Sequence, residues 1–522
     1  MKLAEIFQNG MVLQRRREIP FRGTLEKAQD VRLVLNGTEV ASITAGDVGT
    51  DGTFEIILPP QEAMENAEIT LEGTAGGQDR SQNERLVLQN VDFGEVWLAG
   101  GQSNMDFELS WDAESDKMIA EANDPHFRFY DVGEYAFEGE REENLKADAA
   151  YWYRWMPYAP ADAGKFSAAG VYFALQLREK LGCPVGVIGV NWGGTKASAW
   201  TSREKLLADP YLKFYVEDYD KALSSLSMEK YLKSNYSMRK AASKPERQKA
   251  MDKMMKNEKT SQPGKLESLL INLFTQEVAM GPHNENRPAG LYENMVLPIK
   301  DMQAAGVIWY QGESDDDHAG LYARLFRTMI ECWRETFSQD LPFLFVQLAP
   351  FESWLACVGT RYPELRYQQQ AVEDTVPDAY MASIMDVGSR YDIHPKKKRP
   401  VGERLALLAE KEVYGLDVEA HSPALESLAW NNGELVLHLK NTGGGLEERP
   451  AEEELSGVKA LLKLHVDGTL CDYDYRIEGE NLILKPAGSG GKAEVSFAEM
   501  PYCRVNLYGM NGLPVRPFRG NL

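Results

Sequence analysis

The sequence predicts an α/β protein whose central part is a parallel, doubly wound sheet with helices on both faces. Two observations favour this fold class. Short apolar strands alternate with helical segments between about residues 90 and 413. That order is typical of parallel sheets, since parallel strands are joined by crossover helices. The segments before and after this part have the short alternating pattern of β-strands and no long helical period.

The central elements follow from hydrophobic pattern. Apolar strands are expected at 95–99, 185–190, 306–310, 343–348 and 380–385. Helices are expected at 167–181, 322–337 and 402–413, with one more between the last two strands. Gly182 lies just past the first of these helices and is a typical stop signal. A charged, Met- and Leu-rich stretch at about 202–285 interrupts the alternation and is expected to form helices and a loop.

The two flanking regions are predicted to be β domains. In the first, Asn36-Gly37 and Asp51-Gly52 are hairpin turn signals, and about seven strands are expected. We therefore place an N-terminal β domain at 1–88, the α/β domain at 89–415 and a C-terminal β domain at 416–522. Expected strands of the last domain are 435–439, 460–466, 473–477, 482–484 and 493–497.

Composition excludes several classes of protein. The 522 residues include 43% apolar residues, enough for several cores, so a disordered chain is excluded. The net charge of −22 argues against a general nucleic-acid binder. No apolar run reaches the length of a membrane span, and the first residues lack a signal-peptide pattern, so we expect a cytoplasmic protein. The five cysteines are scattered without a CxxC pair, which favours reduced thiols over a zinc site.

Chemically useful residues follow several of the predicted strands. Residues 100–105 read GGQSNM, 191–195 read NWGGT and 311–315 read QGESD. The loop after the last strand holds Asp392 and His394. Because ligands of open α/β sheets bind outside the carboxyl ends of the strands, these segments are expected to meet in one site.

Within this site, a serine and a histidine suggest nucleophilic catalysis. Ser103 lies in a Gly-rich turn directly after a strand, and His394 is the natural base, with His318 as its rival. A base needs an orienting carboxylate. Asp392, two residues before His394, and Glu313, at a neighbouring strand end, are both candidates for that role.

Donors for an oxyanion are also present. Gly193 or Gly194 can bring a backbone N–H close to a substrate, and the carboxamide of Gln311 can supply a second donor. The N–H of Ser103 is a third. The sequence contains no phosphate-binding loop, dinucleotide fingerprint or zinc-ligand cluster, so neither a metal nor another cofactor is expected.

Several segments together resemble the bacterial sialate O-acetylesterases. The segments are IFQNGMVLQR (6–15), VWLAGGQSNM (96–105), NWGGTKASAW (191–200), GLYENMVLPI (290–299), GVIWYQGESD (306–315), LPFLFVQLAP (341–350) and DIHPKKKRPVGERLAL (392–407). The resemblance covers nearly the whole chain outside 202–285. It implies an SGNH hydrolase, with a flavodoxin-like three-layer α/β/α core, β-sandwich-type domains at both ends and no cofactor.

The resemblance also implies roles for single residues. Ser103 matches the nucleophile and His394 the base, while Gly193, Gly194 and Gln311 match the oxyanion positions. Many SGNH enzymes carry an aspartate three residues before the histidine. Tyr391 occupies that position here, so Asp392 and Glu313 stay open as the acid.

The predicted function is a serine esterase that removes O-acetyl groups from sugars through an acetyl-serine intermediate. Sialic acid and acetylated xylan or oligosaccharides are both expected substrate classes. Trp192 and Trp309 flank the motifs and could stack on a sugar, although core packing is the alternative for each. Two alternative functions remain: a short-chain lipase or thioesterase, and a non-catalytic carbohydrate-binding relative. The expected partner is the carbohydrate alone, without nucleic acid or membrane, and the oligomeric state is open.

Overall fold

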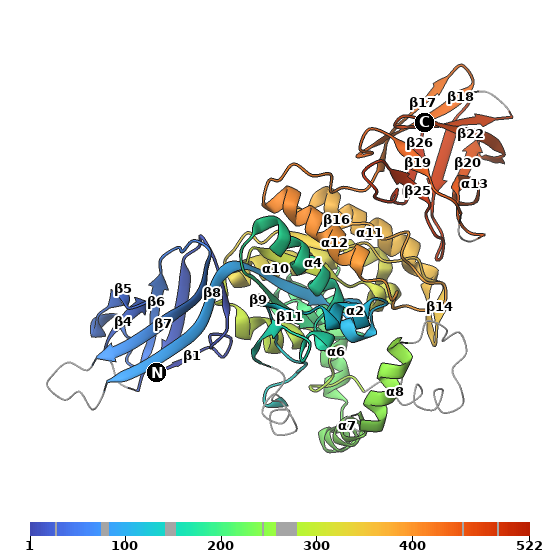
Figure 1. Ribbon diagram of the computed structural model, residues 1–522. Helices are drawn as coiled ribbons and strands as arrows, with labels where there is room; N and C mark the ends of the chain where they lie inside the picture. Colours follow the sequence, from blue (N-terminus) through green and yellow to red (C-terminus); the bar gives the residue numbers. More distant parts are fainter. Residues whose placement is uncertain are drawn as a thin grey trace.

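The computed structural model describes residues 1–522 except 27–28, 75–82, 141–152, 243–244, 257–278, 452–453 and 488–489. A central sheet with the strand order β10-β9-β11-β8-β12-β13-β16 organises the molecule (Figure 1). Its strands are parallel apart from the edge strand β10. Their bounds are β8 (Glu84–Gly101), β9 (Asp124–Asp131), β10 (Trp155–Tyr158), β11 (Val185–Asn191), β12 (Gly306–Tyr310), β13 (Phe343–Val346) and β16 (Ala379–Ala382).

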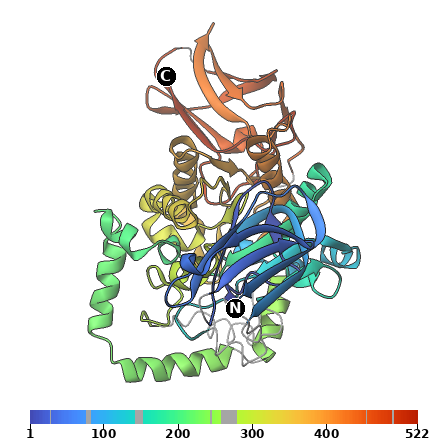
Figure 2. The same cartoon turned by 90° about the vertical axis from the view of Figure 1, so that its left-hand side faces the viewer.

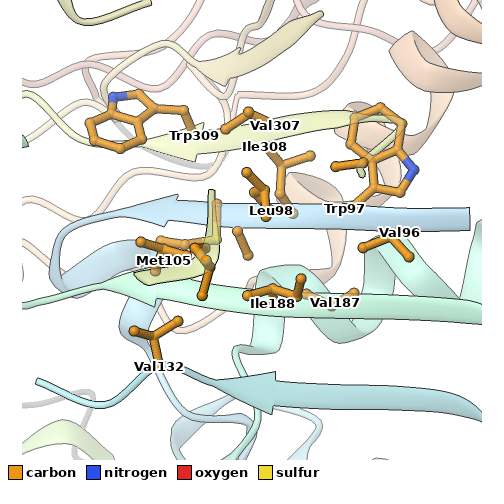
Figure 3. Packing of buried hydrophobic residues seen from close by; sticks show 14 of the residues in the cluster. Val96, Trp97, Leu98, Met105, Val132, Val187, Ile188, Val307, Ile308 and Trp309 are labelled. Atoms are coloured by element: carbon orange, nitrogen blue, oxygen red, sulfur yellow. The ribbon is translucent and has the colours of Figure 1, made fainter. Parts of the chain in front are cut away.

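Helices pack on both faces of this sheet. Trp97 of β8 and Trp309 of β12 point to opposite faces, because Trp97 pairs with Gly306, three residues before Trp309. Trp97 packs against Phe173 of one helix, and Trp309 packs against Phe326 of another. Figure 3 shows both tryptophans among the buried residues of their strands. The main helices are α4 (Ala168–Leu181), α10 (Tyr322–Phe337), α11 (Tyr362–Thr375) and α12 (Arg399–Leu408), the last continued by a π-turn at Ala409–Val413.

The N-terminal strands form two sheets, and one of them is continuous with the central sheet. Strands β1 (Lys2–Leu3), β3 (Ile19–Thr24) and β6 (Thr53–Leu58) form one sheet. Strands β4 (Asp30–Leu35), β5 (Thr38–Ile43) and β7 (Met64–Thr74) join the first part of β8, and β2 (Val12–Gln14) pairs with its middle. The expected boundary at residue 88 therefore falls inside one long strand, visible in Figure 1 as the strand that runs from the N-terminal sheets into the centre.

The C-terminal strands enclose a hydrophobic core of their own. One four-stranded sheet holds β17 (Ala424–Asn431), β18 (Glu434–Lys440), β22 (Tyr473–Glu478) and β23 (Asn481–Pro486). A second holds β20 (Leu462–Val466), β21 (Thr469–Cys471), β24 (Ala493–Phe497) and β26 (Phe518–Asn521). A short pair, β19 (Leu446–Glu448) with β25 (Leu507–Gly509), and the helical turn α13 (Val458–Leu461) complete this part. The expected strand at 460–466 thus begins as helix.

This C-terminal part is attached to the chain segment that leads to His394. Arg404 forms a bidentate ion pair with Asp386, which also accepts a hydrogen bond from Tyr508 Oη at 2.9 Å. Arg366, fully buried, donates to the carbonyl oxygen of Pro501 at 2.7 Å. The C-terminal strands therefore support the loop after β16, on which the predicted base lies.

The predicted insertion at 202–285 lies partly outside the described residues. Its described part contains α5 (Arg203–Ala208), α6 (Phe214–Ser224), α7 (Met228–Ala242) and α8 (Pro245–Lys256). Figure 2 shows these helices, drawn in green, reaching away from the sheet. In the part of the chain that the structure describes, no helix is long and apolar enough to cross a membrane.

Candidate active site

Ser103 is the first residue of the short helix α1 (Ser103–Asp106), directly after β8. The two glycines before it allow the strand to approach β12 closely. A Cβ on Gly100 would lie 2.7 Å from the ring of Trp309, and one on Gly101 would lie 2.1 Å from the carbonyl oxygen of Tyr310. Gly101 also has φ +139°, a conformation that other residues rarely adopt. The paired glycines thus fix where Ser103 emerges from the sheet.

Gly101→Ala is expected to lower the free energy of unfolding by about 3 kcal/mol or more, since backbone atoms cannot yield to the added methyl group. Gly182→Ala is the matched control. Gly182 also has a positive φ, +60°, but no atom lies within 4 Å of its added Cβ, so only backbone strain of about 1 to 2 kcal/mol is expected. Denaturant unfolding of both variants checks the difference, and equal losses would contradict it.

The structure brings His394 to Ser103. His394 Nε2 lies 2.9 Å from Ser103 Oγ, within hydrogen-bond distance. The imidazole is buried, and its ring meets that of Trp354 edge to face at 5.1 Å. The rival His318 instead packs against Phe214. The geometry therefore pairs Ser103 with His394.

Burial lowers the pKa of His394 well below 6.5, and the nearby cations Lys396 and Lys398 lower it further. The imidazole is consequently neutral at physiological pH and able to accept the proton of Ser103.

This shift predicts a pH profile. Activity on an uncharged ester is lost when His394 becomes protonated, so kcat/KM should persist as pH falls through 6.5 and decline only well below it. Lys396→Gln removes a charge that repels the imidazolium, so the acidic limb should move to higher pH. Lys397→Gln is the control, because Lys397 is exposed between the two buried lysines. If the acidic limb of the kcat/KM profile stayed at the same pH in Lys396→Gln, this explanation of the His394 pKa would be contradicted.

Asp392 lies beside His394 but binds other groups. Its Oδ1 accepts a hydrogen bond from the backbone N–H of His394 at 2.9 Å and lies 3.7 Å from Nδ1 of the ring. Its Oδ2 forms an ion pair with Lys396 Nζ at 2.8 Å. His394 Nδ1 itself is buried and has no hydrogen-bond partner among the described residues.

Glu313 approaches the same loop indirectly. Its Oε1 accepts a hydrogen bond from Asn104 Nδ2 at 2.6 Å, and Asn104 also donates to the carbonyl oxygen of Ile393 at 3.0 Å. Asn104 Oδ1 accepts from Lys398 Nζ. Burial raises the pKa of Glu313 and lowers that of Lys398 to about 7. Asn104 thus links the nucleophile helix, Glu313 and the histidine loop.

Sequence reasoning did not assign Asn104 or Lys398 a role, although both lie inside the quoted motifs. The only signal was their neighbourhood: Asn104 follows the serine, and Lys398 lies in a lysine run next to the histidine. A lysine run is usually solvent-exposed, yet Lys398 is fully buried. That burial becomes visible only in the folded chain.

Gln311 is not placed as an oxyanion donor, which corrects the expectation. It is fully buried, and its Nε2 donates to the carbonyl oxygen of Thr195 at 3.1 Å and to Asp315 Oδ2 at 2.6 Å. Its Oε1 accepts from Tyr322 Oη at 2.9 Å. The buried carboxylate of Asp315 needs a donor, and Gln311 supplies it instead of facing a substrate.

The two glycines of the second motif differ. A Cβ on Gly193 would lie 3.4 Å from Ser103 Cβ, so the backbone of Gly193 borders the nucleophile. No atom lies within 4 Å of the same position on Gly194, which is exposed. Gly193 is therefore the glycine that the fold brings to Ser103.

The two tryptophans expected to stack on a sugar, Trp192 and Trp309, differ in their burial. Trp309 is buried, with the rings of Trp333, Phe326 and Trp200 at 5.7, 6.0 and 6.2 Å, so its expected role in sugar stacking is wrong and the packing alternative holds. Trp192 is partly buried beside the main core. Trp354, which the sequence did not single out, is the partly exposed tryptophan in contact with His394. Within the described ranges, no group of three or more potential metal ligands is found.

Comparison with known proteins finds similarity to carbohydrate esterases. Residues 278–408, which include His394 and Glu313, match the model of a family described as a carbohydrate esterase, sialic acid-specific acetylesterase. The sialate O-acetylesterase of Mus musculus is 28% identical over 414 residues, which are 74% of this chain and 68% of that protein. That of Rattus norvegicus is 26% identical over 443 residues, 79% and 74% of the two chains.

A solved structure covers the whole length. A carbohydrate acetylesterase from Xanthomonas citri is 26% identical, with a TM-score of 0.72, and the match covers 99% of both chains. The resemblance predicted from the motifs is thereby confirmed. The chain is therefore similar to sialate O-acetylesterases over most of its length, and it is a carboxylic ester hydrolase.

Proposed function

We propose that this protein is a serine esterase that removes O-acetyl groups from carbohydrates. The observation that carries the proposal is the 2.9 Å contact between Ser103 Oγ and His394 Nε2. The names of the relatives indicate the substrate class. The helix-covered parallel sheet supports an SGNH-type core.

The reaction has two steps. Ser103 Oγ attacks the acetyl carbonyl carbon while His394 Nε2 takes the hydroxyl proton, and the same proton passes to the departing sugar oxygen. Water then attacks the acetyl-serine, with His394 as base, and acetate leaves as Ser103 regains a proton. The backbone N–H groups of Ser103 and Gly193 are the proposed oxyanion donors, because Gly193 borders Ser103.

Asp392 is the proposed orienting acid. Its Oδ1 is 3.7 Å from Nδ1 of His394, so a shift of less than 1 Å would form the hydrogen bond. Such bonds are often long without substrate and shorten in the reacting complex. Glu313 is proposed instead to position the histidine loop through Asn104.

The acyl specificity tests the proposal against the lipase and thioesterase class. Aryl esters from acetate to octanoate are compared by kcat/KM, beside acetate release from acetylated monosaccharides and xylo-oligosaccharides. We expect acetate to be preferred and acetate to be released from at least one sugar. Preference for octanoate, with no acetate from any sugar, would overturn the assignment.

The five cysteines are free thiols, and a cytoplasmic location stays a prediction.

A further inference from the structure

Asp106 is a carboxylate beside the nucleophile that the mechanism does not use. It lies three residues after Ser103, so the two side chains share one side of the helical turn. Its Oδ2 is 3.9 Å from the position of a Cβ on Gly193, and that position is 3.4 Å from Ser103 Cβ. The carboxylate therefore borders the Gly193 side of the nucleophile, where the ester and its sugar must sit.

The carboxylate of Asp106 has no hydrogen-bond or ion-pair partner among the described residues, and it is partly exposed. Each of the other acids around the site has at least one bound carboxylate oxygen. Asp392 pairs with Lys396, Glu313 accepts from Asn104, and Asp315 accepts from Gln311. The carboxylate oxygens of Asp106 are therefore open to donors from outside the chain, and the hydroxyl groups of a ligand are such donors.

The charges that act on Asp106 are negative. Burial raises its pKa well above the usual range, and the nearby Asp131 and Glu108 raise it further. Asp131 is itself raised, to a pKa of about 7, mainly by burial. Glu108 faces Asp252 and the cations Lys165 and Lys256.

The two lysines on the His394 side of the Ser103–His394 pair are also bound to other residues. Lys398 is fully buried and bonded to Asn104, and Lys396 is paired with Asp392. A substrate carboxylate beside Ser103 would therefore meet negative charge where its recognition needs an arginine or lysine.

We propose that Asp106 is a specificity-determining residue that accepts hydrogen bonds from the hydroxyl groups of an uncharged O-acetylated sugar and disfavours substrates that carry a carboxylate. The inference rests on the proposed esterase function and narrows its substrate class. Among the expected substrates it favours neutral acetylated saccharides over free O-acetylated sialic acid.

The test compares 9-O-acetyl-N-acetylneuraminic acid with its methyl ester, which differs in the carboxylate charge. 4-Nitrophenyl acetate serves as a reference without a sugar. At pH 8 the wild-type protein should prefer the methyl ester by about tenfold or more in kcat/KM, a Coulombic difference of about 1.4 kcal/mol. Asp106→Asn should reduce that preference to within about threefold. Asp116→Asn, at an exposed aspartate, removes the same charge and should change nothing.

A pH series gives a second readout that needs no variant. The ratio of kcat/KM for the methyl ester to kcat/KM for the free acid does not depend on the titration of His394, because that titration affects both substrates equally. That ratio should fall as pH drops from 8 to 5.5, because burial raises the pKa of the neighbouring Asp131 to about 7 and raises the pKa of Asp106 as well, so that the negative charge beside Ser103 decreases. Wild-type preference for the free acid, or an unchanged ratio in Asp106→Asn, would overturn the inference. If the wild-type protein did not hydrolyse 4-nitrophenyl acetate at all, the proposed esterase function itself would be contradicted.

Discussion

Ser103→Ala is expected to lower kcat for acetyl-ester hydrolysis by about a thousandfold or more, the usual loss when a member of a catalytic triad is removed. The hydroxyl is the group that forms the acetyl-serine bond, and no other serine lies at the Nε2 of His394 in the described structure. Among the described residues, Ser103 Oγ forms a hydrogen bond with His394 alone, so folding should be unaffected.

The measurement is kcat for 4-nitrophenyl acetate and for one acetylated sugar, with thermal unfolding beside it. Ser202→Ala is the matched control. The Ser202 side chain caps α5 by accepting from the N–H of Lys205, so its loss should cost about 1 kcal/mol of stability and no activity. Near wild-type activity of Ser103→Ala, in preparations free of other esterases, would end the nucleophile assignment.

The parts of the site that could be predicted are those fixed by chain topology. Ser103 and His394 each follow a strand of the same parallel sheet, and parallel strands end at one edge. Their meeting therefore required only that both strands be recognised. The glycines before Ser103 also indicate a site at this strand end, because a glycine pair there indicates close backbone approach.

Side-chain choices among several partners could not be predicted. Gln311 lies at the expected strand end, yet the buried Asp315 four residues later captures its amide. Trp309 lies within the strand that precedes Gln311, β12, and points into the core, where Trp333 and Phe326 enclose it. Both outcomes depend on the packing of a helix, α10, that lies further along the chain, and no local pattern reports that packing.

The expected boundary at residue 88 lies within a strand, which the hydrophobic pattern did not indicate. Periodicity locates strands but does not say when one strand serves two sheets. Residues 84–101 pair first with β7 and then with β11 and β12, so a single strand crosses the expected junction at residue 88. Asn90, which has a positive φ of 56°, marks an irregularity within this strand.

The second large effect is expected at Asp392. Asp392→Asn keeps a side-chain oxygen for the N–H of His394 but removes the charge that stabilises the imidazolium and selects its tautomer. In a serine triad that change costs about 10⁴ in kcat. Glu313→Gln keeps an acceptor for Asn104 Nδ2, so the histidine loop stays in place, and we expect a loss of no more than about tenfold.

Asp392→Asn also leaves Lys396 without its partner in a buried position, which by itself can destabilise a protein by about 3 to 5 kcal/mol. Lys396→Gln and the double variant Asp392→Asn/Lys396→Gln separate the two effects. The double variant should recover stability while kcat stays low, because only the orientation of His394 is still missing. A larger loss of kcat in Glu313→Gln than in Asp392→Asn would make Glu313 the orienting acid. Recovery of kcat in the double variant would show that Asp392 serves only to neutralise Lys396.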